Sequence, residues 1–74
     1  MIYHTTHYVN PESKRQYRLE LSKDLLGDLT VSAFYGNQRN IHYYSTMKAA
    51  QQFYQKEHQR RIQRKYKVCA HEPY

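Results

Sequence analysis

The hydrophobic pattern of this chain changes once, from strict alternation to a helical repeat, and that change limits the folds it can adopt. In the front part, Tyr17, Leu19 and Leu21 alternate with polar residues, which is the period of a strand with one buried face. The segment 29–35 alternates in the same way. Clusters of turn residues separate these runs over 22–28 and 36–40. We therefore expect strands over residues 2–9, 16–21, 29–35 and 41–44.

The back part is expected to form one long helix that begins at Ser45 or Thr46, either of which can cap it. It holds no Gly or Pro before Pro73 and is rich in good helix formers, so we expect it to continue to near Lys65. The sequence therefore predicts an α+β fold, in which one long C-terminal helix packs across an antiparallel sheet of about four strands. We expect one domain over residues 1–74, with 67–74 as a flexible tail.

The two halves of this helix differ in composition. Its first half places Met47, Ala50, Phe53 and Tyr54 on one side, whereas residues 55–65 contain a single apolar residue. A helical segment that is polar all round is not held by a core. We expect this second half to extend past the sheet or to lie on its rim.

Length and cysteine content limit what can stabilise the fold. A chain of 74 residues builds one modest core, and Cys69, as the single cysteine, excludes an internal disulfide. The sequence contains no apolar run approaching the roughly 20 residues of a membrane span, and its first residues do not resemble a signal peptide. We expect a cytoplasmic protein that does not contact a membrane.

Positive charge is concentrated in the helical part. The chain carries 12 Lys and Arg against 6 Asp and Glu. Residues 1–45 hold five basic and four acidic side chains, while residues 46–74 hold seven and two. A field concentrated on one element suits a polyanionic partner. The alternative is that the charge only keeps a small protein soluble.

Several motifs, taken in order, resemble the WGR domain family, in particular its short stand-alone bacterial members. The run 14–21, Lys-Arg-Gln-Tyr-Arg-Leu-Glu-Leu, resembles the first strand of that family, and 24–27, Asp-Leu-Leu-Gly, resembles the turn that follows it. The naming Trp-Gly-Arg stands here as Tyr35-Gly36-Asn37. Residues 46–53 are similar to the family's Ala-containing helix, and 61–66 to its closing Lys-x-x-Arg-Gly-Tyr, with Lys65 in place of Gly.

This resemblance covers residues 2 to 67 and implies an antiparallel sheet with one helix packed across it. The family occurs in poly(ADP-ribose) polymerases, where it contacts DNA ends and neighbouring domains, and in short bacterial proteins. What the resemblance implies about function is therefore DNA binding. The residues that would contact a DNA end are among those that differ in this chain.

Neither an enzyme nor a metal site is expected. Cys69 and His71 lie in the expected tail, where a preorganised nucleophile and base cannot be held. His4 and His7 would point to opposite faces of a strand, and one cysteine cannot complete a structural zinc site. We expect no cofactor.

We therefore expect a non-catalytic nucleic-acid-binding module that contacts the phosphate backbone, with DNA favoured over RNA. Tyr35, at a strand end, is expected to lie near the contact, although its place in the alternation also fits packing against the helix. The expected contact residues are Arg61, Arg64, Lys65, Arg60, Arg39, Tyr35, Asn37 and Lys67.

Two other uses of these surfaces stay open. The basic helix could bind an acidic protein. The tyrosine-rich sheet could instead serve a protein-interaction or self-assembly role. We expect a monomer or a weak homodimer.

Overall fold

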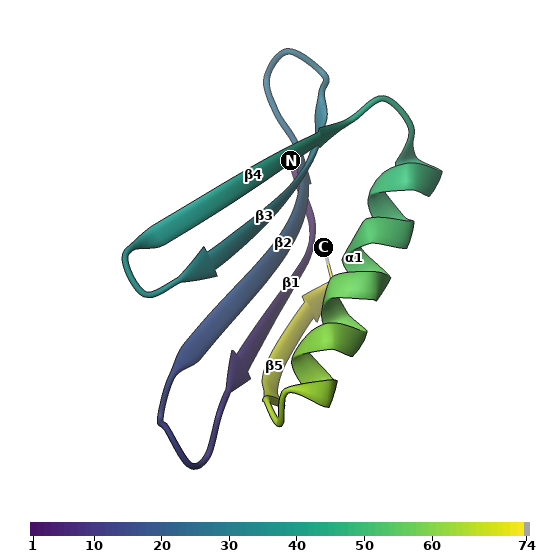
Figure 1. Cartoon of the computed structure of the whole chain (residues 1–74). Helices are drawn as coiled ribbons and strands as arrows, with labels where there is room; N and C mark the ends of the chain where they lie inside the picture. Colours follow the sequence, from purple (N-terminus) through teal and green to yellow (C-terminus); the bar gives the residue numbers. More distant parts are fainter. Residues whose placement is uncertain (74) are drawn as a thin grey trace.

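A computed structural model gives the fold and describes residues 1–73 (Figure 1). Within these described residues, five strands and one helix follow one another. They are β1 (Ile2–Val9), β2 (Gln16–Lys23), β3 (Leu29–Tyr35), β4 (Gln38–Tyr44), α1 (Met47–Gln63) and β5 (Lys67–Pro73).

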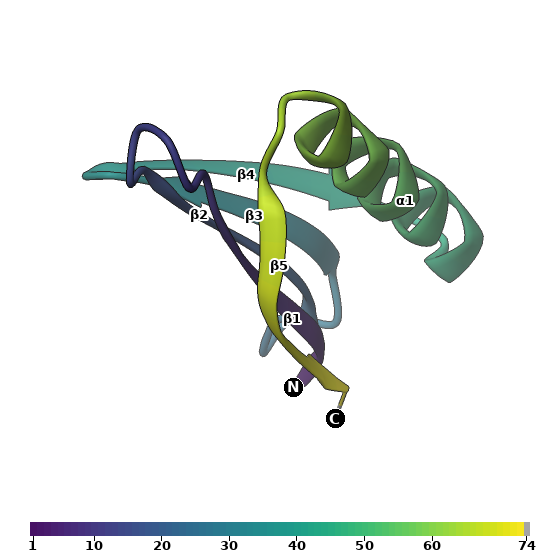
Figure 2. The same cartoon turned by 90° about the horizontal axis from the view of Figure 1, so that it is seen from below.

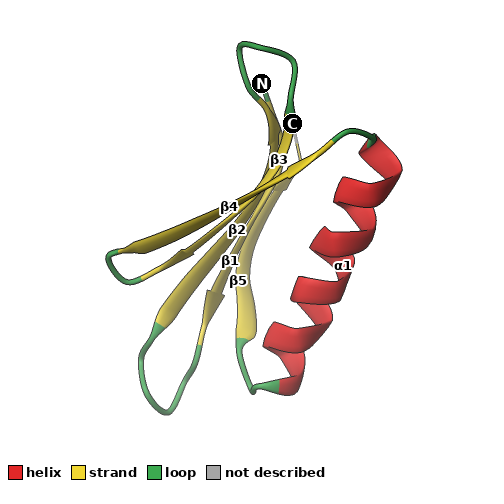
Figure 3. Ribbon diagram, turned by 45° about the horizontal axis from the view of Figure 1, so that its top comes forward, coloured by secondary structure: helices red, strands yellow, loops and turns green. Residues whose placement is uncertain are grey.

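The strands form one antiparallel sheet in the order β4-β3-β2-β1-β5. Leu19 lies opposite Ala33, and Leu21 lies opposite Val31, so the alternating apolar residues of β2 and β3 share one face. Helix α1 covers that face, and the opposite face carries no helix (Figures 2 and 3). The predicted α+β class, with one helix packed across an antiparallel sheet, is confirmed; the sheet has five strands where about four were expected.

The fifth strand corrects the expectation of a flexible tail over 67–74. Residues Lys67–Pro73 form β5 and pair with β1, with His71 opposite Thr6 and Lys67 opposite Val9. Residue 74 lies outside the described residues. Local composition gave no sign of this strand because its pairing partner is at the other end of the sequence, and β1 has one edge free to accept it.

A tight turn at the end of α1 directs the chain back into the sheet. The backbone N–H of Tyr66 donates to the carbonyl of Arg61 at 3.0 Å, and that of Lys65 donates to Ile62 at 3.1 Å. These two bonds form the Schellman arrangement, which requires a left-handed residue after the helix. Lys65 takes that conformation, with φ 66°. The reversal places Lys67 where β5 begins.

The start of the helix follows the sequence closely. Thr46 has extended backbone angles, and its Oγ1 accepts a hydrogen bond from the Ala49 N–H at 3.2 Å, which identifies it as the N-cap residue. Ala50 and Tyr54 are buried against the sheet. No helix in residues 1–73 is long and apolar enough to cross a membrane.

The β3–β4 hairpin is tighter than expected. Strand β4 begins at Gln38, which pairs with Tyr35, so the turn consists of Gly36 and Asn37 alone. Gly36 takes φ 57° there, a conformation that glycine adopts without strain. Arg39 and Asn40 therefore lie within a strand, and their polar side chains are tolerated because β4 is an exposed edge.

The core differs in chemistry between its two ends. At the end where β2 finishes and α1 begins, which we call the aliphatic end, the buried residues are Leu21 and Val31. At the end where α1 finishes, which we call the tyrosine end, they are Tyr8, Tyr17 and Tyr66. Tyrosine buries a large ring while its hydroxyl requires a polar partner. The oxygen of Tyr8 lies 2.6 Å from His58 Nδ1, within hydrogen-bonding distance.

Candidate nucleic-acid interface

A groove runs between the second half of α1 and the helix-covered face of the sheet, at the tyrosine end. It has a volume of about 880 Å³. The helix contributes Lys56, Arg60 and Arg64 to its lining, while β3 and β4 contribute Tyr35 and Asn40 among others. The basic side chains that line it are Arg15, Lys56, Arg60, Arg61 and Arg64, and Glu57 is the one carboxylate among the described lining residues.

Three exposed cations form a row along the helix wall of the groove. Lys56, Arg60 and the C-cap residue Arg64 follow one another at intervals of four residues. Side chains at this spacing lie on the same face of a helix, with Cβ atoms about 5–6 Å apart. Gln55 and Gln59 are also exposed but lie outside the groove lining. The row therefore presents its charge to the groove instead of to the outer face of α1.

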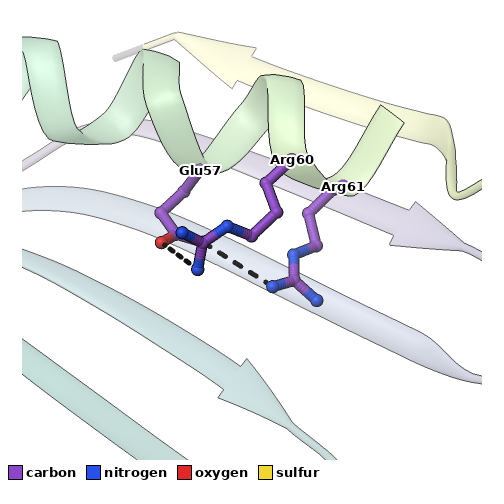
Figure 4. A network of polar contacts seen from close by, with 3 residues as sticks. All are labelled: Glu57, Arg60 and Arg61. Carbon is purple, nitrogen blue, oxygen red and sulfur yellow. Dashed lines mark ion pairs between the residues drawn. The ribbon is translucent and has the colours of Figure 1, made fainter. Parts of the chain in front are cut away.

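Glu57 sets the roles of the two adjacent arginines. Its side chain is 11% exposed and forms ion pairs with Arg60 at 3.4 Å and Arg61 at 3.7 Å (Figure 4). Arg60 stays 48% exposed, whereas Arg61 is 12% exposed. The carboxylate is thus already neutralised within the protein, and Arg60 keeps donors free for an external anion.

Arg61 is bound into the tyrosine end of the core. Its guanidinium carbon lies 4.3 Å from the centre of the Tyr17 ring and 5.9 Å from that of Tyr66, which is cation–π geometry. The Nε atom is buried and has no hydrogen-bond partner among the residues that the structure describes. Arg61 therefore contributes positive potential to the groove from its buried position. The exposed row of Lys56, Arg60 and Arg64 contributes the accessible hydrogen-bond donors.

Tyr35 lies in the groove together with an arginine that the sequence analysis missed. Arg15 Nη1 donates to the Tyr35 hydroxyl at 2.6 Å. The Tyr35 ring is half-buried and lies 6.4 Å from the Tyr17 ring. Tyr35 packs against the core, as its place in the alternation suggests, and it also lines the groove.

Burial of the tyrosine end also affects ionisation. Desolvation raises the pKa of the Tyr17 phenol, and the nearby Arg61 charge partly offsets that rise. Desolvation likewise raises the pKa of Tyr8, with a further contribution from Tyr54. These hydroxyls stay neutral hydrogen-bonding groups at physiological pH.

Of the eight residues expected in the site, the structure brings four together and separates four from them. Tyr35, Arg60, Arg61 and Arg64 line the groove. Outside its lining are Asn37, in the hairpin turn, and Arg39, whose guanidinium lies 6.0 Å from the Phe34 ring. Lys65 occupies the turn after α1, and Lys67 begins β5.

Five of the polar groove residues that would matter most for binding were not expected from the sequence as site residues. These are Arg15, Lys56, Gln38, Asn40 and His42. Lys56 lies four residues before Arg60, and this spacing predicts that the two side chains share one face of the helix. The other four depend on the pairing of β2 with β3 and of β3 with β4, which brings Tyr17, Tyr35 and Gln38 into one row across the sheet.

No protein-family model matches this chain, and neither a curated protein nor a solved structure matches it. The groove has one cationic wall on α1, one polar wall on β4, and the aromatic residues Tyr35 and Phe53 in its lining.

Proposed function

We propose that this protein is a non-catalytic nucleic-acid-binding module and that it holds the phosphate backbone in the groove beside α1. The observation that carries the proposal is the exposed row Lys56, Arg60 and Arg64, which faces the groove together with Arg15. The one carboxylate among the described lining residues is already paired with two arginines. A net positive, concave surface of this kind attracts a polyanion.

The energetic source of binding would be counterion release. Four exposed cations that each neutralise one phosphate predict a slope of about −3 in log K against log salt for a single strand, and a steeper one for a duplex. Such contacts position a backbone without reading its sequence. DNA is favoured over RNA because of the resemblance to the WGR family. Tyr35, which stands at the family's Trp position, lies beside this row.

Fluorescence anisotropy with labelled oligonucleotides, at about 50 and 200 mM salt, tests the proposal. The triple variant Lys56→Gln/Arg60→Gln/Arg64→Gln should lose most of the affinity and most of the salt dependence. A matched control, Lys23→Gln/Lys48→Gln/Lys67→Gln, removes the same number of charges from exposed positions outside the groove. Equal loss in the two variants would mean that net charge, and not the groove, determines binding.

The second candidate function is self-assembly through the sheet. Tyr43 is 64% exposed on the face that carries no helix, and Ile41 lies half-buried on that same face. Strand β4 is also an edge of the sheet, with backbone groups free to pair with another strand. A dimer whose mass in size-exclusion chromatography does not change between low and high salt would favour this function. An acidic protein partner for the groove would instead appear as salt-sensitive binding that nucleic acid displaces.

A further inference from the structure

The two walls of the groove differ in a way that indicates how a nucleic acid would lie in it. We infer that the groove takes a single strand, with its phosphates along the helix row and its bases turned towards β4. This inference rests on the proposed function and adds strandedness and orientation to it. It comes from the chemistry of the wall opposite the cations.

That opposite wall is rich in hydrogen-bonding groups, and its described β4 lining residues include no Lys, Arg, Asp or Glu. Gln38, Asn40 and His42 occupy alternate positions of β4, so their side chains point to the same face of the sheet. All three are exposed. Amide side chains can donate and accept at once, and in nucleic-acid complexes they pair with base edges. A phosphate, which only accepts, is better served by the cations of the facing wall.

Aromatic rings lie between these two walls. Phe53 of α1 is half-buried, and its ring centre lies 4.6 Å from the ring of His42. Tyr35 is half-buried at the other end of the same stretch. Rings flanked by cations form the usual platform for unpaired bases, because every base has a stacking face. The sequence of cations, rings and amides across the groove therefore corresponds to the sequence of phosphate, base face and base edge across a single strand.

A duplex does not fit the same arrangement. Its base edges are accessible only inside its own grooves, and side chains on the inner wall of a protein groove do not reach into them. The protein could present α1 itself to a major groove, about 12 Å wide. In that orientation Gln55 and Gln59, which are exposed outside the protein groove, would meet the bases, while the cation row would face the sheet. Single-stranded sequences, whose bases can turn outward, use both walls at once.

The experiment compares one sequence in single-stranded and blunt duplex form, each as DNA and as RNA, by anisotropy titration of the full chain. We expect single strands to bind at least about tenfold more tightly than either duplex. The variant Gln38→Ala/Asn40→Ala should weaken single-strand binding by about tenfold and leave the salt slope unchanged, because no phosphate contact is removed. Both residues are exposed, so the fold should persist, and circular dichroism checks this.

A matched variant, Gln55→Ala/Gln59→Ala, removes two amides from the outer face of α1 and should leave single-strand binding unchanged. If the duplex binds as tightly as the single strand and still requires the helix row, the preference for a single strand is refuted, whereas the proposed binding of phosphates by the row is supported. If the helix glutamines matter and the β4 amides do not, the orientation is refuted. Absence of binding to every form at low salt would refute the proposed function together with this inference.

Discussion

The aliphatic end and the tyrosine end of the core solve the same packing problem with different side chains. Leu21 and Val31 are 1% and 0% exposed and stabilise the fold by removing apolar surface from water. Tyr8 and Tyr17 are almost as buried, but each carries a hydroxyl that must find a partner. A core made of tyrosines can thus border a polar groove, since its rings pack together and also contact polar groups such as His58 and Arg61. Most of the described groove lining therefore lies at the tyrosine end, and His42 and Phe53 extend it towards Val31, the partner of His42 in β3.

The largest expected effect lies at the aliphatic end. Leu21→Ala should lower the free energy of unfolding by about 3 kcal/mol, because it removes buried methyl groups and leaves a cavity. Urea denaturation measures the change. Leu25→Ala is the matched control, because Leu25 is fully exposed in the β2–β3 turn and its loss should be nearly neutral. Similar losses from the two leucines would show that the aliphatic end is not a packed core.

The next effect lies at the tyrosine end. Glu57→Gln should lower the free energy of unfolding by about 2 kcal/mol, because the mostly buried Arg61 loses its counter-charge while the half-exposed Arg60 is solvated instead. Anisotropy of the same variant should show tighter nucleic-acid binding, since Arg60 is released towards the groove. Glu12→Gln, in an exposed turn, controls for the loss of one negative charge. If the variant loses stability without any gain in affinity, Arg60 does not take part in nucleic-acid binding.

Alkaline pH should act on the tyrosines and leave the aliphatic residues unaffected. Burial raises the pKa of Tyr17 and of Tyr54, the latter despite its hydrogen bond to Thr6. The unfolded chain therefore releases these protons first, so stability should be constant below about pH 10 and should fall above it. The slope should be about 1.4 kcal/mol per pH unit for each such tyrosine. Denaturation midpoints that stay constant well above pH 10 would contradict the burial of these phenols.

The smallest effect concerns the turn that joins the two layers at the tyrosine end. Lys65→Gly should raise the free energy of unfolding by about 0.5–1 kcal/mol, because glycine adopts the left-handed φ of that position without strain. Binding should not change, since Lys65 lies outside the groove lining. Gln52→Gly is the contrasting variant, because residue 52 is exposed in the interior of the helix, where glycine should destabilise by about 1 kcal/mol. Thermal denaturation of the two variants should give shifts of the melting temperature that are opposite in sign, upward for Lys65→Gly and downward for the contrasting variant.

The sequence predicted the elements whose signals are local. Alternation in Tyr17, Leu19 and Leu21 identified β2, and the capping residues Ser45 and Thr46 marked the start of α1 to within one residue, because burial on one face and capping both act over a few residues. Strand β5 was missed, since its partner β1 is about sixty residues away in the chain. Here pairing with a distant edge decided the structure, and local composition did not.

The candidate site could be predicted only in outline. The sequence indicated that positive charge is concentrated in the second half of α1, but it did not indicate which side of that half faces the sheet. The orientation of α1 about its own axis places Arg61 over the Tyr17 ring and leaves Lys56 exposed in the groove. Arg15 joined the site through a hydrogen bond to Tyr35, twenty positions further along the chain. Contacts of this kind depend on strand register, which composition does not define.

The pairing of β1 with β5 has a practical consequence for handling the molecule. Because His4 lies opposite Pro73, the first and last described strands bring residues near both chain ends to the same end of the sheet, away from the end of α1 that leads into β5 (Figure 1). A tether attached near either chain end would leave the groove open to solution. Immobilisation on a sensor surface, or fusion to a reporter, should therefore preserve access for an oligonucleotide.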